Sequence, residues 1–168
     1  MAELNPRDRL QPFLLDRLTD DQSDQTKESR EKFVFSPRQL KEALLRDLAW
    51  LLNTQAPVPG DGLADFPAVL SSVINYGIPD LTGTTASGLK GLAFERSILR
   101  AIQTFEPRLE RRGVTVRLVT EQETSTPNQI ALEIRGEIIA TNLPDPLYIK
   151  TEVDLETGQM ALKDRPNG

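Results

Sequence analysis

The sequence predicts an α+β fold in which three core helices precede an antiparallel meander of three to four strands. Two observations predict it. Up to Phe105, apolar residues recur at spacings of three and four residues, as they do along one face of a helix. From Val114 onward they alternate with polar residues, which is typical of strands with one buried face. We expect three segments: a short N-terminal docking helix in residues 1–19, a flexible polar tether in residues 20–32 and one folded domain in residues 33–168.

Composition excludes several classes of function. The 168 residues contain no cysteine and no histidine, which removes disulfide frameworks, thiolate zinc sites, the commonest metal ligand and the usual catalytic base. The formal net charge of −5 argues against a phosphate-binding surface, and therefore against nucleic acid as a partner. No segment approaches the roughly 20 apolar residues of a membrane helix, and residues 1–10 do not resemble a secretory signal. We therefore expect a cytoplasmic protein without a cofactor, a metal or a membrane insertion.

The N-terminal helix is predicted from an apolar stripe. Leu10, Phe13, Leu14 and Leu18 fall on one face of a short helix. Residues 20–32 carry no large apolar side chain, so they do not bury enough surface to offset the entropy of ordering. A short apolar helix on such a tether is typical of a docking peptide. Packing of the helix on its own domain predicts the same pattern, and the sequence does not separate the two.

The first helix of the folded domain is predicted to begin at Ser36 and Pro37, a hydroxyl N-cap followed by a proline at the first helical position. Trp50 lies off the apolar stripe of this helix and is available for a second packing surface. Arg46 and Asp47 are expected on the solvent side. The predicted buried stripe comprises Leu40, Ala43, Leu44, Leu48, Leu51 and Leu52.

Two further helices are predicted before the strands. The shorter one covers residues 65–74, with Asp65 as its N-cap and Gly77 as the residue that takes the left-handed stop. The longer one covers residues 89–105 and ends before Pro107, because the residue that precedes a proline disfavours the helical region. Its predicted buried stripe comprises Phe94, Ile98, Ala101 and Phe105.

Four alternating runs follow, beginning near Val114, Ile130, Leu147 and Met160. Gly136 interrupts the second run and indicates a β-bulge or a close backbone approach. The acidic side chains of the runs alternate with the apolar ones and therefore share the opposite face. This pattern favours a charged, hydrated sheet surface over the convergent pair of carboxylates that a glycosidase needs.

Glu106-Pro107-Arg108 is the most informative short segment outside the predicted elements. It lies between the last helix and the first strand, and it places an acid and a five-donor cation on either side of a rigid residue. Such a pair suits the clamping of a polar partner. Taken alone, the residues favour the simpler interpretation, a helix stop flanked by surface charges.

Four motifs occur in the order in which they occur in TssE proteins, the baseplate wedge proteins of bacterial type VI secretion systems. Residues 9–18, RLQPFLLDRL, resemble the N-terminal segment of that family. Residues 44–54, LLRDLAWLLNT, resemble its Arg-Asp-Leu-x-Trp-Leu-Leu-Asn helix, and residues 72–80, SVINYGIPD, its Asn-Tyr-Gly-x-Pro-Asp turn. Glu106-Pro107-Arg108 resembles the Glu-Pro-Arg signature shared with lysozyme-like wedge proteins of contractile phage tails.

The resemblance implies a structural role and no enzymatic activity. Such proteins join TssF and TssG in wedges around the VgrG hub of a membrane-docked cytoplasmic baseplate, with TssK as a further neighbour. They form the platform on which the TssB/TssC sheath begins to polymerise. By the motif, Glu106, Pro107 and Arg108 would hold the helical core bundle of the wedge. The lysozyme-like label keeps a peptidoglycan hydrolase as the alternative function, although a fold name does not carry an activity. A free adaptor that uses residues 10–18 is a third hypothesis.

A sheet that ends in a short strand offers backbone groups to another chain. We expect such an edge in the hairpin region from Tyr148 to Leu162, where a sheath subunit would add a strand. The predicted sheath-contact residues are Tyr148, Ile149, Lys150, Thr151, Glu152 and Val153.

Overall fold

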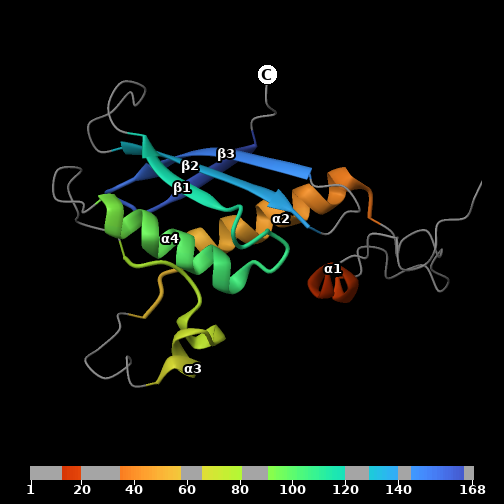
Figure 1. Cartoon of the computed structure of the whole chain (residues 1–168), viewed down its shortest axis with the longest axis horizontal. Helices are drawn as coiled ribbons and strands as arrows, with labels where there is room; N and C mark the ends of the chain where they lie inside the picture. Colours follow the sequence, from red (N-terminus) through yellow and green to blue (C-terminus); the bar gives the residue numbers. More distant parts are fainter. Residues whose placement is uncertain are drawn as a thin grey trace, which may run out of the picture.

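Figure 1 shows a computed structural model of the chain, which describes residues 13–19, 35–57, 66–80, 91–119, 129–139 and 145–164. The predicted tether, residues 20–32, lies outside the described residues, as do Leu10 and Asp65. The elements are α1 (Leu14–Leu18), α2 (Pro37–Leu52), α3 (Pro67–Leu70), the 3₁₀ helix η4 (Val73–Asn75), α4 (Gly91–Phe105), β1 (Thr115–Val119), β2 (Gln129–Ile138), β3 (Asp145–Asp154) and β4 (Met160–Asp164). None of the described helices is both long and apolar enough to cross a bilayer.

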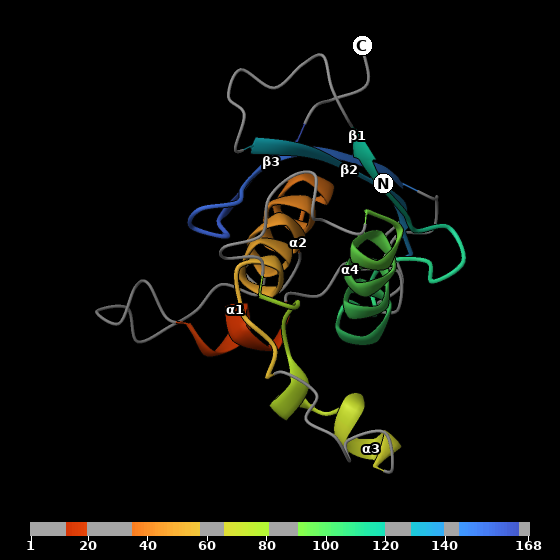
Figure 2. The same cartoon turned by 90° about the vertical axis from the view of Figure 1, so that its left-hand side faces the viewer.

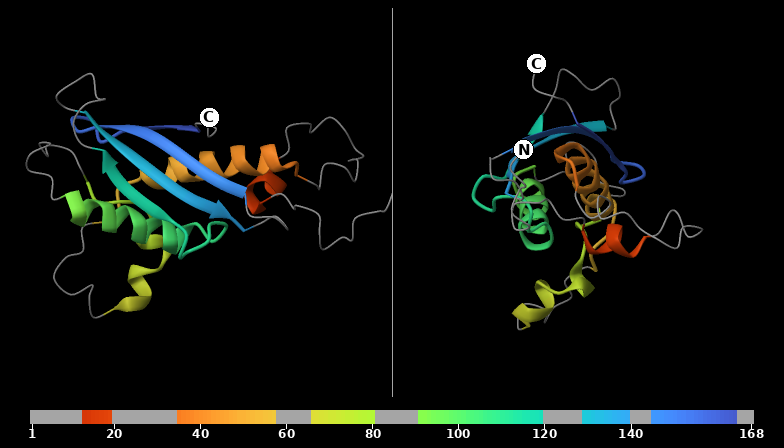
Figure 3. Two further views of the ribbon diagram at one scale, coloured as in Figure 1. Left: turned by 45° about the horizontal axis from the view of Figure 1, so that its top comes forward. Right: turned by 90° about the vertical axis from the view of Figure 1, so that its right-hand side faces the viewer.

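The body of the molecule has two layers. The four strands form one antiparallel sheet in which the spatial order is the sequence order, β1-β2-β3-β4. Helices α2 and α4 lie side by side against one face of this sheet (Figures 2 and 3). The predicted α+β fold, with helices that precede a strand meander, is confirmed.

Helix α2 begins as the sequence predicts. The Ser36 side chain accepts a hydrogen bond from the Gln39 backbone, and the Gln39 side chain accepts one from the Ser36 backbone, so the two residues form a capping box. Trp50 is half exposed. All six residues of the predicted stripe are buried: Leu40, Ala43, Leu44, Leu48, Leu51 and Leu52.

Helix α4 supplies the other half of the helical layer. Phe94, Ile98, Ala101 and Ile102 are buried against α2 and the sheet, and Phe105 is half-buried at the end of the helix. The strands contribute the opposing side of the core, which includes Leu132, Ile134, Ile138, Leu147, Ile149 and Val153. Because the two layers share one core, the end of α4 and the middle of α2 are held at fixed positions.

The predicted second helix is not a single buried element. It is divided into α3 and η4, and Val73 and Ile74 are 83% and 70% exposed. The Ser72 hydroxyl donates to the Val69 carbonyl (2.8 Å), and the Asn75 amide donates to the Leu70 carbonyl (3.0 Å). These side chains take the place of the next helical N–H groups, so the helix ends after four residues.

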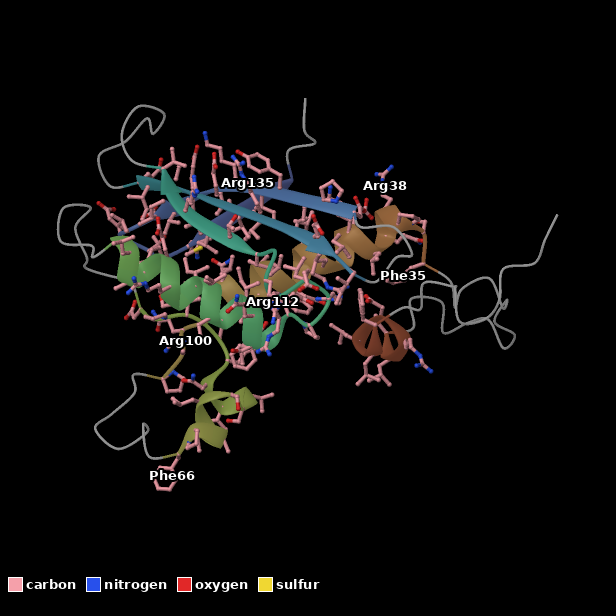
Figure 4. All side chains as sticks on the ribbon, viewed as in Figure 1. Phe35, Arg38, Phe66, Arg100, Arg112 and Arg135 are labelled. Carbon is pink, nitrogen blue, oxygen red and sulfur yellow. The ribbon has the colours of Figure 1, made fainter. Side chains whose placement is uncertain are left out.

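Residues 66–75, called the arm below, project away from the two layers (Figure 2). Phe66 stands at the far end of the arm (Figure 4) and is 61% exposed.

The chain returns from the arm to the body through Gly77. Its φ is +123°, and a Cβ at this position would lie 2.3 Å from the Thr54 carbonyl oxygen, so only glycine fits. The close approach allows the Ile78 N–H to donate to Thr54 (2.9 Å) and the Ile78 carbonyl to accept from Ala56 (2.8 Å). Ile78 is thereby buried beside the end of α2.

Gly136 does not mark a bulge. The pairing of β2 with β3 runs without interruption from Gln129–Asp154 to Ile138–Asp145. A Cβ at Gly136 would meet Val114 and Leu109 side-chain atoms at 3.5 and 3.7 Å, which is ordinary packing contact. The bulge is excluded, and these contacts do not amount to a close backbone approach either.

The predicted sheath-contact residues, 148–153, do not form a free edge. Residues 149–153 pair with β4 on one side, and residues 148–153 pair with β2 on the other. The prediction of a free edge is therefore wrong for residues 149–153, because β4 covers them. Among the described strands the outer ones are β1 and β4.

A side chain from each core helix bonds the backbone of an outer strand. Asn53, at the end of α2, accepts from the Met160 N–H (2.8 Å) and donates to the Met160 carbonyl (3.0 Å). Glu95 of α4 accepts from the Leu118 N–H of β1 (2.7 Å). The Asn53 side chain therefore occupies the two backbone groups of Met160 that an additional neighbouring strand would otherwise bond. Since backbone groups of alternate residues point to the same side of a strand, the next outward-facing N–H of β4 is that of Leu162.

The face of the sheet away from the helices is charged, as predicted. Arg135 projects from it (Figure 4), pairs with Glu133 (3.2 Å) and lies over the Tyr148 ring. The Tyr148 hydroxyl donates to Glu133 (2.8 Å), and this bond raises the pKa of Tyr148.

Replacement of Gly77 by alanine should destabilise the fold by about 2 kcal/mol or more, because the new methyl group meets backbone atoms at a left-handed φ. Urea unfolding followed by circular dichroism measures this change. Gly113→Ala is the matched control: Gly113 is exposed and its Cβ would have only ordinary contacts, so we expect a change within about 0.5 kcal/mol. Equal effects of the two substitutions would contradict the role of Gly77.

Candidate functional site

The segment Glu106-Pro107-Arg108 forms a rigid corner where α4 ends. The Glu106 N–H still donates to the Ile102 carbonyl (2.8 Å), and Pro107 is exposed, so its missing N–H has no cost. Immediately afterwards, the Arg108 carbonyl accepts from the Ile139 N–H (2.9 Å), and Leu109 forms an antiparallel bridge with Ile138. The corner is therefore attached both to α4 and to the end of β2.

Glu106 and Arg108 form a two-pronged ion pair within this corner. The Arg108 Nε donates to Glu106 Oε1, and its Nη2 donates to Oε2. The Arg108 backbone N–H adds a third bond to Oε1 (3.1 Å). Glu106 is 3% exposed, so its charge is removed from water and depends on Arg108 for compensation. The alternative prediction of a helix stop with surface charges is wrong, because these charges are buried and bonded to each other.

Helix α2 brings a second acid to the corner. Asp47 Oδ2 lies 2.9 Å from Arg108 Nη2, while Asp47 Oδ1 lies 2.9 Å from Arg46 Nη2. Trp50, one turn further along α2, lies under the Arg46 guanidinium at 5.2 Å. Asp47 is half-buried. The Arg-Asp-Leu-x-Trp segment and the Glu-Pro-Arg segment, which are far apart in sequence, therefore form one site.

The surroundings fix the charge of Arg108. Burial lowers the pKa of its guanidinium, but the hydrogen bonds and charges of Glu106 and Asp47 outweigh burial and raise it overall. The guanidinium is therefore charged at every accessible pH. Burial also raises the pKa of the nearby Tyr76, with further contributions from Asp47 and Glu106. Tyr76 packs edge-on against Phe105, with ring centroids 5.2 Å apart.

Arg108 retains donors for a further partner. Its Nη1 is buried and has no acceptor among the residues that the structure describes. A pocket of about 240 Å³ adjoins the site and is lined by Leu15, Asp47, Trp50, Leu51, Tyr76, Phe105, Glu106 and Arg108. A charged donor beside an aromatic-lined pocket suits an acceptor group carried by an amphipathic chain.

Part of the predicted N-terminal stripe reaches this site. The Phe13 ring lies 4.0 Å from the Arg108 guanidinium carbon and contacts Phe35 edge-on. Leu14 and Leu18 point into solvent.

The sequence interpretation missed Arg46 and Asp47, which it assigned to the solvent side. It also missed Asp16, whose Oδ1 lies 2.6 Å from Arg46 Nη1. The sequence offered a way to find these three residues, since each belongs to one of the segments that carry the family resemblance. The other predicted contact residues, 148–153, lie in β3 and belong to a different surface. In the part of the chain that the structure describes, no cluster of acidic side chains is suited to hold a metal ion.

Removal of the Arg108 guanidinium should destabilise the fold because Glu106 is then buried without its cation. We expect Arg108→Met to lower the free energy of unfolding by about 3 kcal/mol or more. Glu106→Gln in the same background should recover part of this loss, because the amide carries no charge. Urea denaturation of the two single variants and the double variant measures the coupling, expected at about 1–3 kcal/mol. Additive effects would show that the two residues do not depend on each other.

Of three comparisons with known proteins, one finds a family that matches this chain. The sequence model of the family described as baseplate wedge protein gp25 matches residues 38–143, which is more than half of the chain. The matched range includes Asp47, the arm and the Glu106-Pro107-Arg108 corner. Neither the comparison with curated proteins nor the comparison with solved structures finds a match. The range and position of the family match show that this chain belongs to the gp25 family of baseplate wedge proteins.

Proposed function

We propose that the chain is a structural wedge component of a type VI secretion baseplate in the bacterial cytoplasm. It joins TssF and TssG, called the wedge partners below, next to TssK and the VgrG hub. It also provides a platform on which the TssB/TssC sheath begins to assemble. Membership of a baseplate wedge family supports the general role. The sequence motifs shared with TssE proteins support the particular machine.

The observation that carries the proposal is the corner itself. The Glu106 carboxylate uses both oxygens to orient Arg108, Asp47 holds the same guanidinium from α2, and Nη1 remains without an acceptor among the described residues. A cation held in place by two carboxylates recognises an acceptor with little loss of side-chain entropy. The donor set suits carbonyl or carboxylate groups of a helical bundle, which is what the wedge partners would supply.

The same geometry disfavours the alternative function as a peptidoglycan hydrolase. A general acid must hold a proton and present it to the glycosidic oxygen. Both Glu106 oxygens instead accept hydrogen bonds from the Arg108 guanidinium, so neither oxygen is free to face a glycosidic bond. Glu133, on the outer face of the sheet, is likewise bonded to Tyr148 and Arg135.

For the sheath, the corrected candidate edge is β4. Its first residue, Met160, is already bonded to Asn53, so strand addition would begin at Leu162. A strand of the sheath that pairs there would extend the order β1-β2-β3-β4 by one.

Arg108→Lys tests the corner without the loss of its charge. An ammonium group still compensates Glu106, but its single nitrogen does not supply the second donor group of the guanidinium. We expect a stably folded variant that binds the wedge partners on the order of tenfold more weakly. Co-purification and titration measure this change. Arg112→Lys, at an exposed arginine nearby (Figure 4), is the control and should bind normally. Undiminished binding of Arg108→Lys would remove the corner from the interface.

Leu162→Pro tests the edge. The proline removes an outward-facing N–H but leaves the hydrogen bonds between β4 and β3 in place. Leu162→Ala removes the same side-chain packing and keeps the N–H, so it is the matched control. We expect sheath assembly in cells to fail with proline and to persist with alanine, as scored by fluorescence microscopy of tagged sheath. Sheaths of normal number and length in the proline variant would exclude β4 as the platform.

A further inference from the structure

Helix α1 covers the candidate site through two polar contacts. The Phe13 ring lies on the Arg108 guanidinium at 4.0 Å, and Asp16 pairs with Arg46 at 2.6 Å. Leu15 lines the pocket that also contains Trp50, Glu106 and Arg108. The contacts come from residues three apart, so an aromatic ring and a carboxylate on one helical turn reach both arginines at once.

These contacts are weak enough to exchange. None of the residues of α1 is buried, and Leu14 and Leu18 are 71% and 73% exposed. A helix of five residues has no stability of its own in water. Its polar contacts are a cation–π contact and one ion pair, and Phe13 adds an edge-on contact with Phe35; each is an interaction of small free energy when it is partly hydrated.

The match between α1 and the site is also imperfect. Arg108 Nη1 has no acceptor among the described residues, and Asp16 Oδ2 is buried without a donor. A buried polar atom without a partner costs free energy. A ligand that places an acceptor on Nη1 and keeps the other two contacts would therefore bind better than α1 does.

We propose that α1 is an internal placeholder: it occupies, in the free chain, the surface that a helix of a wedge partner occupies after assembly. The partner helix carries the same two features, an aromatic side chain for Arg108 and, one turn later, a carboxylate for Arg46, together with an acceptor for Arg108 Nη1. This inference rests on the proposed function of the Glu106-Pro107-Arg108 corner and specifies the partner that the corner takes. Displacement of α1 frees Phe13 to join Leu14 and Leu18 as one apolar face.

The placeholder is tested first in the isolated full-length chain. Trp50 is the only tryptophan and lies beside Arg46 and Leu15, so its fluorescence reports whether α1 is seated. The double variant Phe13→Ala/Asp16→Asn should show Trp50 emission at longer wavelength and stronger quenching by acrylamide. Arg17→Ala, at an exposed position of the same helix, is the control and should match the unaltered chain. A double variant with unaltered Trp50 fluorescence overturns the placeholder.

The second measurement is the affinity for the wedge partners. Loss of two weak internal contacts should make the double variant bind about five- to thirtyfold more tightly than the unaltered chain. A synthetic peptide of residues 9–19 should compete with the wedge partners for the double variant, and the same peptide with Phe13→Ala and Asp16→Asn should not.

Different results would contradict the placeholder and the proposed role of the corner. Equal or weaker binding by the double variant, while Arg108→Lys reduces binding, overturns the placeholder and leaves the proposed function in place. Binding that does not respond to Arg108→Lys overturns the proposed role of the corner, whatever Trp50 reports.

Discussion

The ion pair between Glu106 and Arg108 is the interaction on which the organisation of this molecule depends. It lies where the helical half of the chain passes into the sheet, and its charges are almost completely removed from water. A buried pair of this kind is a weak source of stability but a strong constraint on geometry, because any displacement leaves a charge unsatisfied. Asp47 of α2 and the end of β2 are fixed around it. The corner thereby ties the end of α4, the middle of α2 and the end of β2 together.

The geometry of the site suits recognition of a partner. Its charges compensate one another, its cation is held by Glu106 and by Asp47 of α2, and Arg108 also lines an aromatic-lined pocket. Chemistry needs a group that gains or loses a proton, whereas assembly needs a group that keeps its charge and position. Arg108, whose raised pKa keeps it ionised, meets the second requirement. This agrees with membership of a family of wedge proteins.

The sequence predicted those features that depend on local pattern. The stripe of α2, most of the stripe of α4, the N-cap at Ser36 and the alternation of the strands follow from periods and caps, and they are present in the structure. The break between α3 and η4 was missed because hydrogen bonds from the Ser72 and Asn75 side chains end the helix. The spacing of apolar residues, on which the prediction was based, carries no information about such bonds.

Features that depend on distant partners were not predictable in this way. The roles of Arg46 and Asp47 were missed because a helical period does not reveal a guanidinium that arrives from a remote segment. The edge was assigned to β3 instead of β4, since alternation shows that strands exist but not which backbone groups remain open. The Glu106-Pro107-Arg108 segment was singled out from the sequence, but its burial is known only from the fold.

One helix joins the two ends of this arrangement mechanically. Asn53 bonds the first residue of β4, and Asp47, six positions earlier on α2 and therefore about 9 Å along its axis, bonds Arg108. A pull on the outer strand would therefore act on α2 as well as on β3, and through α2 it would reach the corner.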